Sequence, residues 1–106
     1  MKNIHINTKK IKDNKSLHQV FKDELGFPDY YGMNWDAWID CMTHLDDSRI
    51  GPFKNDEVLC LEISDTEDFN TRLPDLVKHL IECTSFVNQH YKDYVKKNIQ
   101  VVLEFL

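Results

Sequence analysis

Residues 27–45 read FPDYYGMNWDAWIDCMTHL, and the most unusual residues of the chain are concentrated in this stretch. Its first part predicts an extended loop, because Pro28 biases the residue before it away from helical angles and Gly32 permits a tight reversal. Its second part predicts a helix from Trp35, since the Asn34 side chain can accept a hydrogen bond from a free N–H group of the first turn. We therefore expect an aromatic loop that leads into an acidic helix.

The expected helix over residues 35–47 separates into two faces when it is projected at about 100° per residue. The apolar face contains Trp35, Trp38, Met42 and Leu45, with Cys41 beside them. The opposite face contains Asp36, Asp40, Thr43 and Asp47. Taken alone, this pattern is that of an ordinary amphipathic helix with a solvated acidic side.

The charge around this helix indicates more than a solvated face. Between Lys22 and Arg49 the chain has seven acidic residues and no Lys or Arg, so this window carries a charge of −7. The other 11 of the 18 acids and all 13 Lys and Arg lie outside it, which leaves +2 for the rest. A net charge of −5 argues against nucleic-acid binding and favours a basic protein as partner.

The run LHQVFKDELGFPDYYGMNWDAWIDCMTHL resembles the barstar-like family of intracellular ribonuclease inhibitors. The most specific part is the spacing Pro28-x-Tyr30-Tyr31-Gly32-x-Asn34-x-Asp36-Ala37-x-x-Asp40-Cys41. The resemblance is close over residues 16–45 and holds only in pattern elsewhere. In that family the loop and the following helix plug the nuclease active site, where acidic side chains meet basic ones.

The resemblance also implies which residues contact the partner. It assigns contact roles to Tyr30, Tyr31, Asn34, Asp36, Asp40 and Thr43, and the expected contact set also includes Gly32, Ile39 and His44. The family has tryptophan in place of Ile39 and glycine in place of His44. A glutamate that the family contributes from its last helix falls near Tyr91. These departures concern the identity of the target more than the type of interaction.

Composition bounds the class of protein. With 106 residues, of which 42% are hydrophobic, the chain is expected to form a single barstar-like domain over residues 1–106. No apolar run approaches the length of a membrane span, and the amino terminus MKNIHINTKK lacks the core of a signal peptide, so we expect a cytoplasmic protein without a membrane partner. Cys41, Cys60 and Cys83 have no CxxC spacing, which predicts reduced, buried thiols without a disulfide or a zinc site.

The remaining pattern predicts an α/β fold. Strands are expected at residues 3–7, 58–63 and 99–106, and helices at 16–25, 35–47, 66–72 and 74–97. Helices that separate every pair of strands predict a three-stranded parallel sheet with helices packed against it, as in the barstar-like family. The apolar run at 58–63 predicts a strand covered on both faces. Ser16 is expected to cap the first helix, and His18 to lie on its exposed side.

Two alternatives stay open beside the inhibitor of a basic microbial ribonuclease. One is a barstar-like immunity or regulatory module that binds a different toxin. The other is a metal-dependent enzyme, since Asp36, Asp40 and His44 have i, i+4, i+8 spacing on the expected helix. The enzyme ranks lower, because no second element supplies further ligands and no catalytic motif is present. We therefore expect no catalytic residue, no metal and no cofactor.

Overall fold

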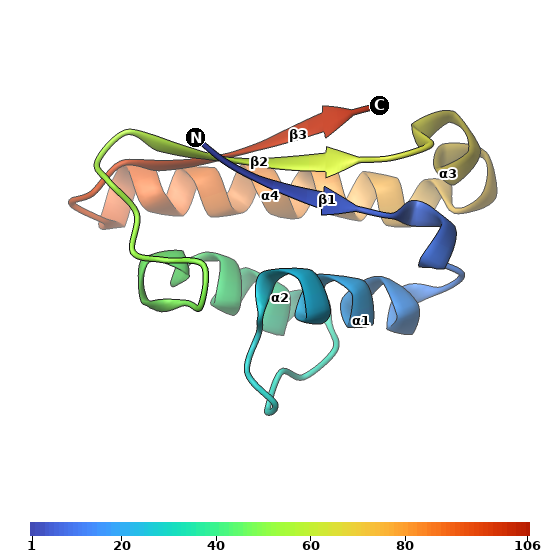
Figure 1. Cartoon of the computed structure of the whole chain (residues 1–106), viewed down its shortest axis with the longest axis horizontal. Helices are drawn as coiled ribbons and strands as arrows, with labels where there is room; N and C mark the ends of the chain where they lie inside the picture. Colours follow the sequence, from blue (N-terminus) through green and yellow to red (C-terminus); the bar gives the residue numbers. More distant parts are fainter.

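Three strands alternate with four α-helices along the chain, and the computed structural model describes all 106 residues. In order, the elements are β1 (Lys2–Ile6), η1 (Thr8–Lys10), α1 (Asn14–Leu25), α2 (Trp35–Met42), η2 (Leu45–Asp47), β2 (Glu57–Ile63), α3 (Thr66–Arg72), α4 (Pro74–Tyr94) and β3 (Ile99–Phe105). The two elements marked η are short 3-10 turns. Figure 1 shows this arrangement, with β2 between the other two strands.

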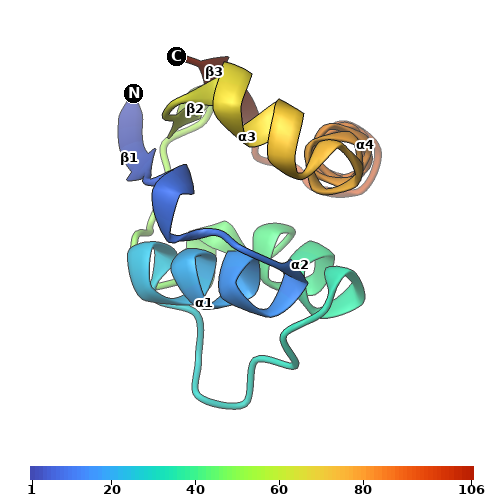
Figure 2. The same cartoon turned by 90° about the vertical axis from the view of Figure 1, so that its right-hand side faces the viewer.

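The sheet is parallel and has the strand order β1-β2-β3, which confirms the predicted α/β class and three-stranded parallel sheet. Ile4 pairs with Leu61, and Leu61 pairs with Leu103 on its other side. The helices lie on one side of the sheet, with α1 against β1 and α4 against β3 (Figure 2). The main core fills the space between sheet and helices, where Ile6 and Val101 are buried.

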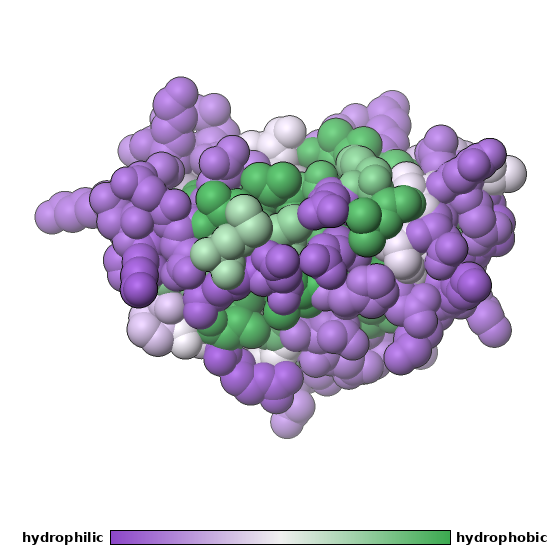
Figure 3. All heavy atoms as spheres, turned by 45° about the horizontal axis from the view of Figure 1, so that its top comes forward, coloured by the Kyte–Doolittle hydropathy of each residue, from purple (hydrophilic) through white to green (hydrophobic).

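The other face of the sheet has no helix over it, so the prediction that residues 58–63 are covered on both faces was wrong. Alternate residues of the outer strands are exposed, namely Asn3, His5, Gln100, Val102 and Glu104. On the central strand, Cys60 is buried by its neighbours and its thiol donates to Glu104 Oε2 at 3.3 Å. Figure 3 looks onto this side and shows apolar side chains gathered among polar ones.

One outer edge of the sheet is partly closed by a side chain. Asn88 of α4 places its carboxamide against Val101 of β3, accepting from the backbone N–H at 2.7 Å and donating to the carbonyl oxygen at 2.8 Å. An edge strand normally presents such groups unpaired. The side chain thus occupies the place that a fourth strand would take at this residue.

The start of α1 differs from the predicted capping box. Asp13 is the N-cap, and its carboxylate accepts from the backbone N–H of Ser16 at 2.8 Å. The Ser16 hydroxyl in turn accepts from the Asp13 N–H at 3.0 Å. Ser16 therefore belongs to the capping box as its third helical residue and not as the cap. The predicted stop at Gly26 is confirmed, because this glycine adopts the left-handed conformation with φ 68°.

The helices α2 and α4 end earlier than predicted. The expected helix over 35–47 stops at Met42, where the Thr43 hydroxyl donates to the carbonyl oxygens of Ile39 and Asp40 and the chain then forms η2. The expected helix over 74–97 ends at Tyr94. Neither α4 nor any other helix is long and apolar enough to cross a membrane.

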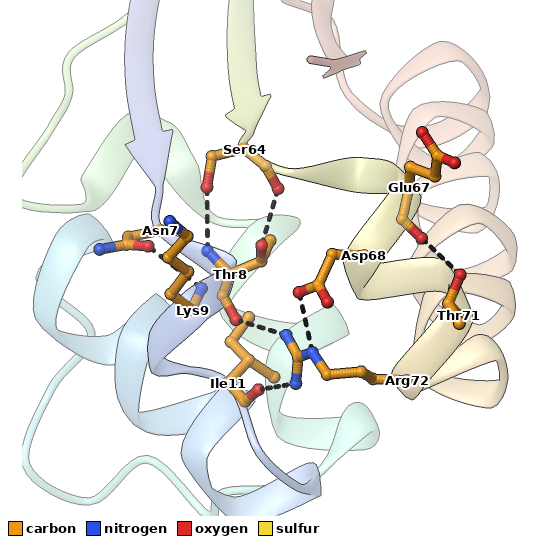
Figure 4. A network of polar contacts seen from close by, with 9 residues as sticks. All are labelled: Asn7, Thr8, Lys9, Ile11, Ser64, Glu67, Asp68, Thr71 and Arg72. Atoms are coloured by element: carbon orange, nitrogen blue, oxygen red, sulfur yellow. Dashed lines mark hydrogen bonds and ion pairs between the residues drawn. The ribbon is translucent and has the colours of Figure 1, made fainter.

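The carboxyl ends of β1 and β2 are joined to α3 by a polar network that we call the Arg72 clamp (Figure 4). The Thr8 hydroxyl donates to the Ser64 carbonyl at 2.7 Å. Arg72 donates to the carbonyl oxygens of Ile11 at 2.9 Å and Thr8 at 3.2 Å, and its Nε lies 2.9 Å from Asp68. One guanidinium thereby holds the chain after β1 against the helix that follows β2.

The three cysteines are free thiols. Cys60 is buried, while Cys41 and Cys83 are partly exposed. Burial is the main cause that raises the pKa of each thiol. These groups therefore stay protonated at neutral pH and are poor nucleophiles.

Candidate partner-binding surface

The loop before α2 and the outer face of α2 form one surface unit on the side of the molecule away from the sheet (Figure 1). Asn34 joins its two parts, since its side-chain oxygen accepts from the Ala37 N–H at 2.8 Å and its nitrogen donates to the Gly32 carbonyl at 3.3 Å. The predicted N-cap is confirmed. The loop therefore enters the helix at an angle that both hydrogen bonds fix.

An aromatic cluster beneath this unit, which we call the aromatic base, fixes α2 against α1. Its members are Phe21, His18, Tyr31, Trp35 and Trp38. The ring centroids of Trp35 and Trp38 lie 5.5 Å apart, and Trp38 meets Phe21 edge-on at 5.7 Å. Edge-to-face pairs of this kind stabilise a packed cluster beyond the area that they bury. The buried indole nitrogens of Trp35 and Trp38 have no conventional hydrogen-bond partner.

His18 belongs to this base, and the prediction that it lies on an exposed side was wrong. Its side chain is fully buried and Nδ1 is hydrogen-bonded to the Tyr31 hydroxyl, while Nε2 has no partner. Burial lowers the pKa of His18 to about 4, so the imidazole is neutral at pH 7. Burial also raises the pKa of Tyr31. The helical projection failed here because the loop folds back over the flank of α1, which no periodicity within α1 reveals.

The two acids of the predicted site project from the other side of α2. Asp36 and Asp40 are exposed, while Trp38 and Met42 are buried, so the two predicted faces of the helix are present. No Lys or Arg lies within ion-pair distance of either carboxylate. Their charge is therefore available to a partner.

The other predicted contact residues divide by exposure. Tyr30 is 86% exposed, and Gly32, Asn34 and His44 are exposed as well. Ile39 is half-buried. Tyr31 and Thr43 are buried, at 5% and 8% exposure. These two position the surface from below and offer little area for contact.

His44 stands just beyond the end of α2. Its Nδ1 lies 2.7 Å from the Asp40 carbonyl oxygen, and since a carbonyl only accepts, Nδ1 carries the proton. The side chain is 64% exposed, which leaves Nε2 free to meet a partner. No group of three or more His, Cys, Asp or Glu side chains could hold a metal ion, so Asp36, Asp40 and His44 do not form a ligand set.

A groove of about 560 Å³ runs between the loop and the segment after α2. Its walls include Tyr30, Asp40, His44, Asp47 and Arg49. The Arg49 guanidinium packs on Gly26 so closely that a Cβ there would lie 2.2 Å from Nε. Sequence reasoning did not assign Arg49 to this surface. The glycine at residue 26 is the one signal for this contact in the sequence, and its pattern also predicts the end of α1.

Tyr91, the position at which the family's last-helix glutamate was expected, has a structural role. Its ring is 2% exposed, and its hydroxyl donates to the Met42 carbonyl at 2.6 Å and accepts from the Leu45 N–H at 3.0 Å. The side chain therefore anchors the end of α2 to α4. It supplies no negative charge to the surface.

Comparison with known proteins extends over nearly the whole chain. Residues 1–104 match the model of the family described as "Barstar (barnase inhibitor)". The chain is also 32% identical over 96 residues to a Bacillus subtilis (strain 168) protein named "Putative ribonuclease inhibitor YrdF", covering 91% of this chain and 96% of that protein. The family match over residues 1–104 includes all three strands as well as the loop, α2 and α4.

Proposed function

This chain belongs to the barstar family, and from that premise we propose that it is an intracellular, immunity-type inhibitor that binds a basic microbial ribonuclease and blocks its active site. The partner is a protein, and neither nucleic acid nor membrane is part of the function. The free thiols fit the cytoplasm, where cysteines stay reduced.

The observation that carries this proposal is the pair of exposed carboxylates on α2. No Lys or Arg lies within ion-pair distance of Asp36 or Asp40, and the His44 imidazole lies 3.8 Å from the Asp40 carboxylate, so a partner disturbs at most this one exposed contact. A ribonuclease must attract the phosphates of RNA, and its active site is therefore basic. Two carboxylates on a rigid helix can occupy the place of two phosphates.

Shape supports the same function. Tyr30 stands exposed beside the acids, and an aromatic side chain with little rotamer freedom is a typical interface anchor. The loop that carries it is held by Asn34 and by the Tyr31–His18 contact. A surface that is ordered before binding does not have to be ordered by the partner, which favours affinity.

The main alternative is a different toxin as the target. Ile39 and His44 stand where the family has tryptophan and glycine, and both lie within the proposed contact surface. An imidazole with a free Nε2 offers a contact that glycine lacks. With these two residues the chain would bind through the same surface but would fit a different partner.

The test is inhibition of barnase, the ribonuclease that the family description names. We expect RNA cleavage to fall to zero at equimolar protein, and Asp40→Asn to weaken binding by more than about 2 kcal/mol. That magnitude is a general one for central charged anchors, for which the barnase–barstar pair is itself a standard example. The matched control is Glu67→Gln, which removes an exposed charge from α3 on another part of the molecule and should change binding by a few tenths of a kcal/mol.

Unchanged cleavage at tenfold excess of the protein would reject barnase as the target and favour the different toxin. Inhibition that survives neutralisation of both Asp36 and Asp40 would reject the surface itself. Binding without loss of cleavage would show that the active site stays open to substrate.

A further inference from the structure

One flank of α4 carries a row of side chains that we call the aromatic strip. It consists of His79, Phe86, His90 and Tyr94, with Cys83 between the first two. Phe86 is 58% exposed and Tyr94 79% exposed, while the rings of His90 and Tyr94 lie 5.4 Å apart. Large apolar side chains that gather on one flank of a helix are typical of an interaction surface.

Contacts with α2 show where this strip lies. The His79 ring is 6.0 Å from the ring of Trp35. Burial, then Glu82 and then Asp36 raise the pKa of the Cys83 thiol, so Asp36 of α2 lies near this residue of α4. Phe86 follows Cys83 by one helical turn, so it lies on the same flank. The strip therefore adjoins the α2 flank that carries Asp36 and Ile39.

We infer that the partner-binding surface continues from α2 onto the aromatic strip, and that the partner carries an apolar patch beside its basic centre. This inference rests on the proposed function, because it extends the same binding site. The occupant is the basic ribonuclease itself.

Charge distribution argues for this occupant. None of the five residues is Lys or Arg, and acidic side chains border them, because Glu82 precedes Phe86 by one helical turn and Asp36 of α2 lies near Cys83. Interfaces commonly combine aromatic residues with a lack of charge at their centre and polar groups around them. Packed helices lie about 8–10 Å apart, so both parts fit within one interface of ordinary size. A basic partner would thus meet carboxylates and an apolar area side by side.

The opposite flank of α4 supplies a matched control. Ile81 is also exposed, at 44%, but it follows the buried Val77 by one turn on the flank that turns toward Asn88 and β3. Truncating either side chain removes a comparable apolar area from the same helix. Only Phe86 belongs to the proposed interface.

The experiment measures binding of Phe86→Ala, Phe86→Tyr and Ile81→Ala to barnase, with Asp40→Asn as a reference. We expect Phe86→Ala to raise Kd at least about tenfold through faster dissociation, by the same factor at low and high salt. Phe86→Tyr should stay within about threefold of the wild type, and Ile81→Ala within about twofold. Circular dichroism spectra should be unchanged, because both side chains are exposed.

The outcomes separate this inference from the proposed function. If Asp40→Asn weakens binding and Phe86→Ala does not, the strip is not part of the interface and the inhibitor function stands. If the wild type does not bind barnase, both are rejected for this target. Self-association of the free protein that Phe86→Ala abolishes would assign the strip to a second copy and overturn the inference.

Discussion

The Arg72 clamp and the outer face of α2 carry charge in opposite ways. In the clamp, Arg72 binds Asp68 and donates to two backbone carbonyls, so the guanidinium is paired with groups of its own chain. On α2, Asp36 and Asp40 face solvent with no Lys or Arg beside them. We therefore expect the clamp to stabilise the native structure, and the exposed acids to contribute little to folding and to remain available for binding.

Asp46 shows that position in the sequence does not decide whether a charge is paired within the chain or exposed to solvent. It belongs to the same acidic window as Asp36, yet its carboxylate accepts from the Phe53 N–H at 2.6 Å and from Lys97 at 3.0 Å. The hydrogen bond from Phe53, followed by that from Lys97, lowers the pKa of Asp46. The localised charge of the window is therefore partly structural.

The largest effect is expected where the aromatic base supports the free acids. Trp38→Ala should lower the free energy of unfolding by about 3–5 kcal/mol, because it removes a fully buried indole and leaves a cavity. Trp35→Ala should cost less, since Trp35 is only half-buried. Urea denaturation measures both. Equal losses would mean that α2 sits in a different rotation about its axis.

The second-largest loss of stability is expected when the Arg72 clamp is broken. Arg72→Met should lower the free energy of unfolding by about 2–3 kcal/mol, because two carbonyl oxygens lose a charged donor while most of the apolar stem is kept. Arg49→Met is the control, since Arg49 makes one long hydrogen bond of 3.5 Å at the surface. A loss as small as that of the control would show that the clamp does not stabilise the fold.

The pH dependence of stability tests the base through His18. The folded protein holds this histidine with a pKa lowered to about 4 from 6.5, so the unfolded chain binds more protons between these values. Stability is therefore complete above about pH 6.5 and falls as the pH decreases toward 4, by roughly 2 kcal/mol between about pH 7 and pH 5. His18→Gln should remove most of this dependence. If the stability of His18→Gln depended on pH as that of the wild type does, the imidazole of His18 would not be buried and neutral in the native protein.

The smallest effect is expected at the free acids themselves. Asp36→Asn together with Asp40→Asn should change the free energy of unfolding by less than about 0.5 kcal/mol, as is usual for exposed positions, where a contact such as that of His44 with Asp40 contributes little. Asp46→Asn, in the same window, should destabilise more because it loses Lys97. Thermal and urea unfolding of the three proteins side by side would show the order. A large loss of unfolding free energy in the Asp36→Asn, Asp40→Asn double variant would show that these acids stabilise the fold.

Most of the fold could be predicted because its signals are local. The apolar strands, the glycine that ends α1 and the Asn34 cap depend on residues close together in the chain, and the structure has all of them. The open face of the sheet was missed because an apolar run such as 58–63 does not reveal whether a second layer of helices exists. Only the packing of α1 and α4 on one side decides that.

The site could be predicted less completely, because burial there depends on distant segments. His18 is covered by the loop that carries Tyr31, and Asp46 is paired by Lys97 from after α4. Within the expected contact set, Tyr31 and Thr43 proved to be buried while Tyr30, Asp36 and Asp40 are exposed. That these exposed residues touch a partner stays a prediction.

The Asn88 carboxamide has a consequence for the protein at high concentration. A three-stranded sheet has two open edges, and each is a potential template on which a strand of another molecule can grow. At β3 the carboxamide already binds both backbone groups of Val101, so an incoming strand would first have to displace it. Aggregation by strand addition should therefore start at β1. Replacing Asn88 with an aliphatic residue would leave the backbone groups of Val101 unpaired, so that fibrils could also grow from the edge of β3.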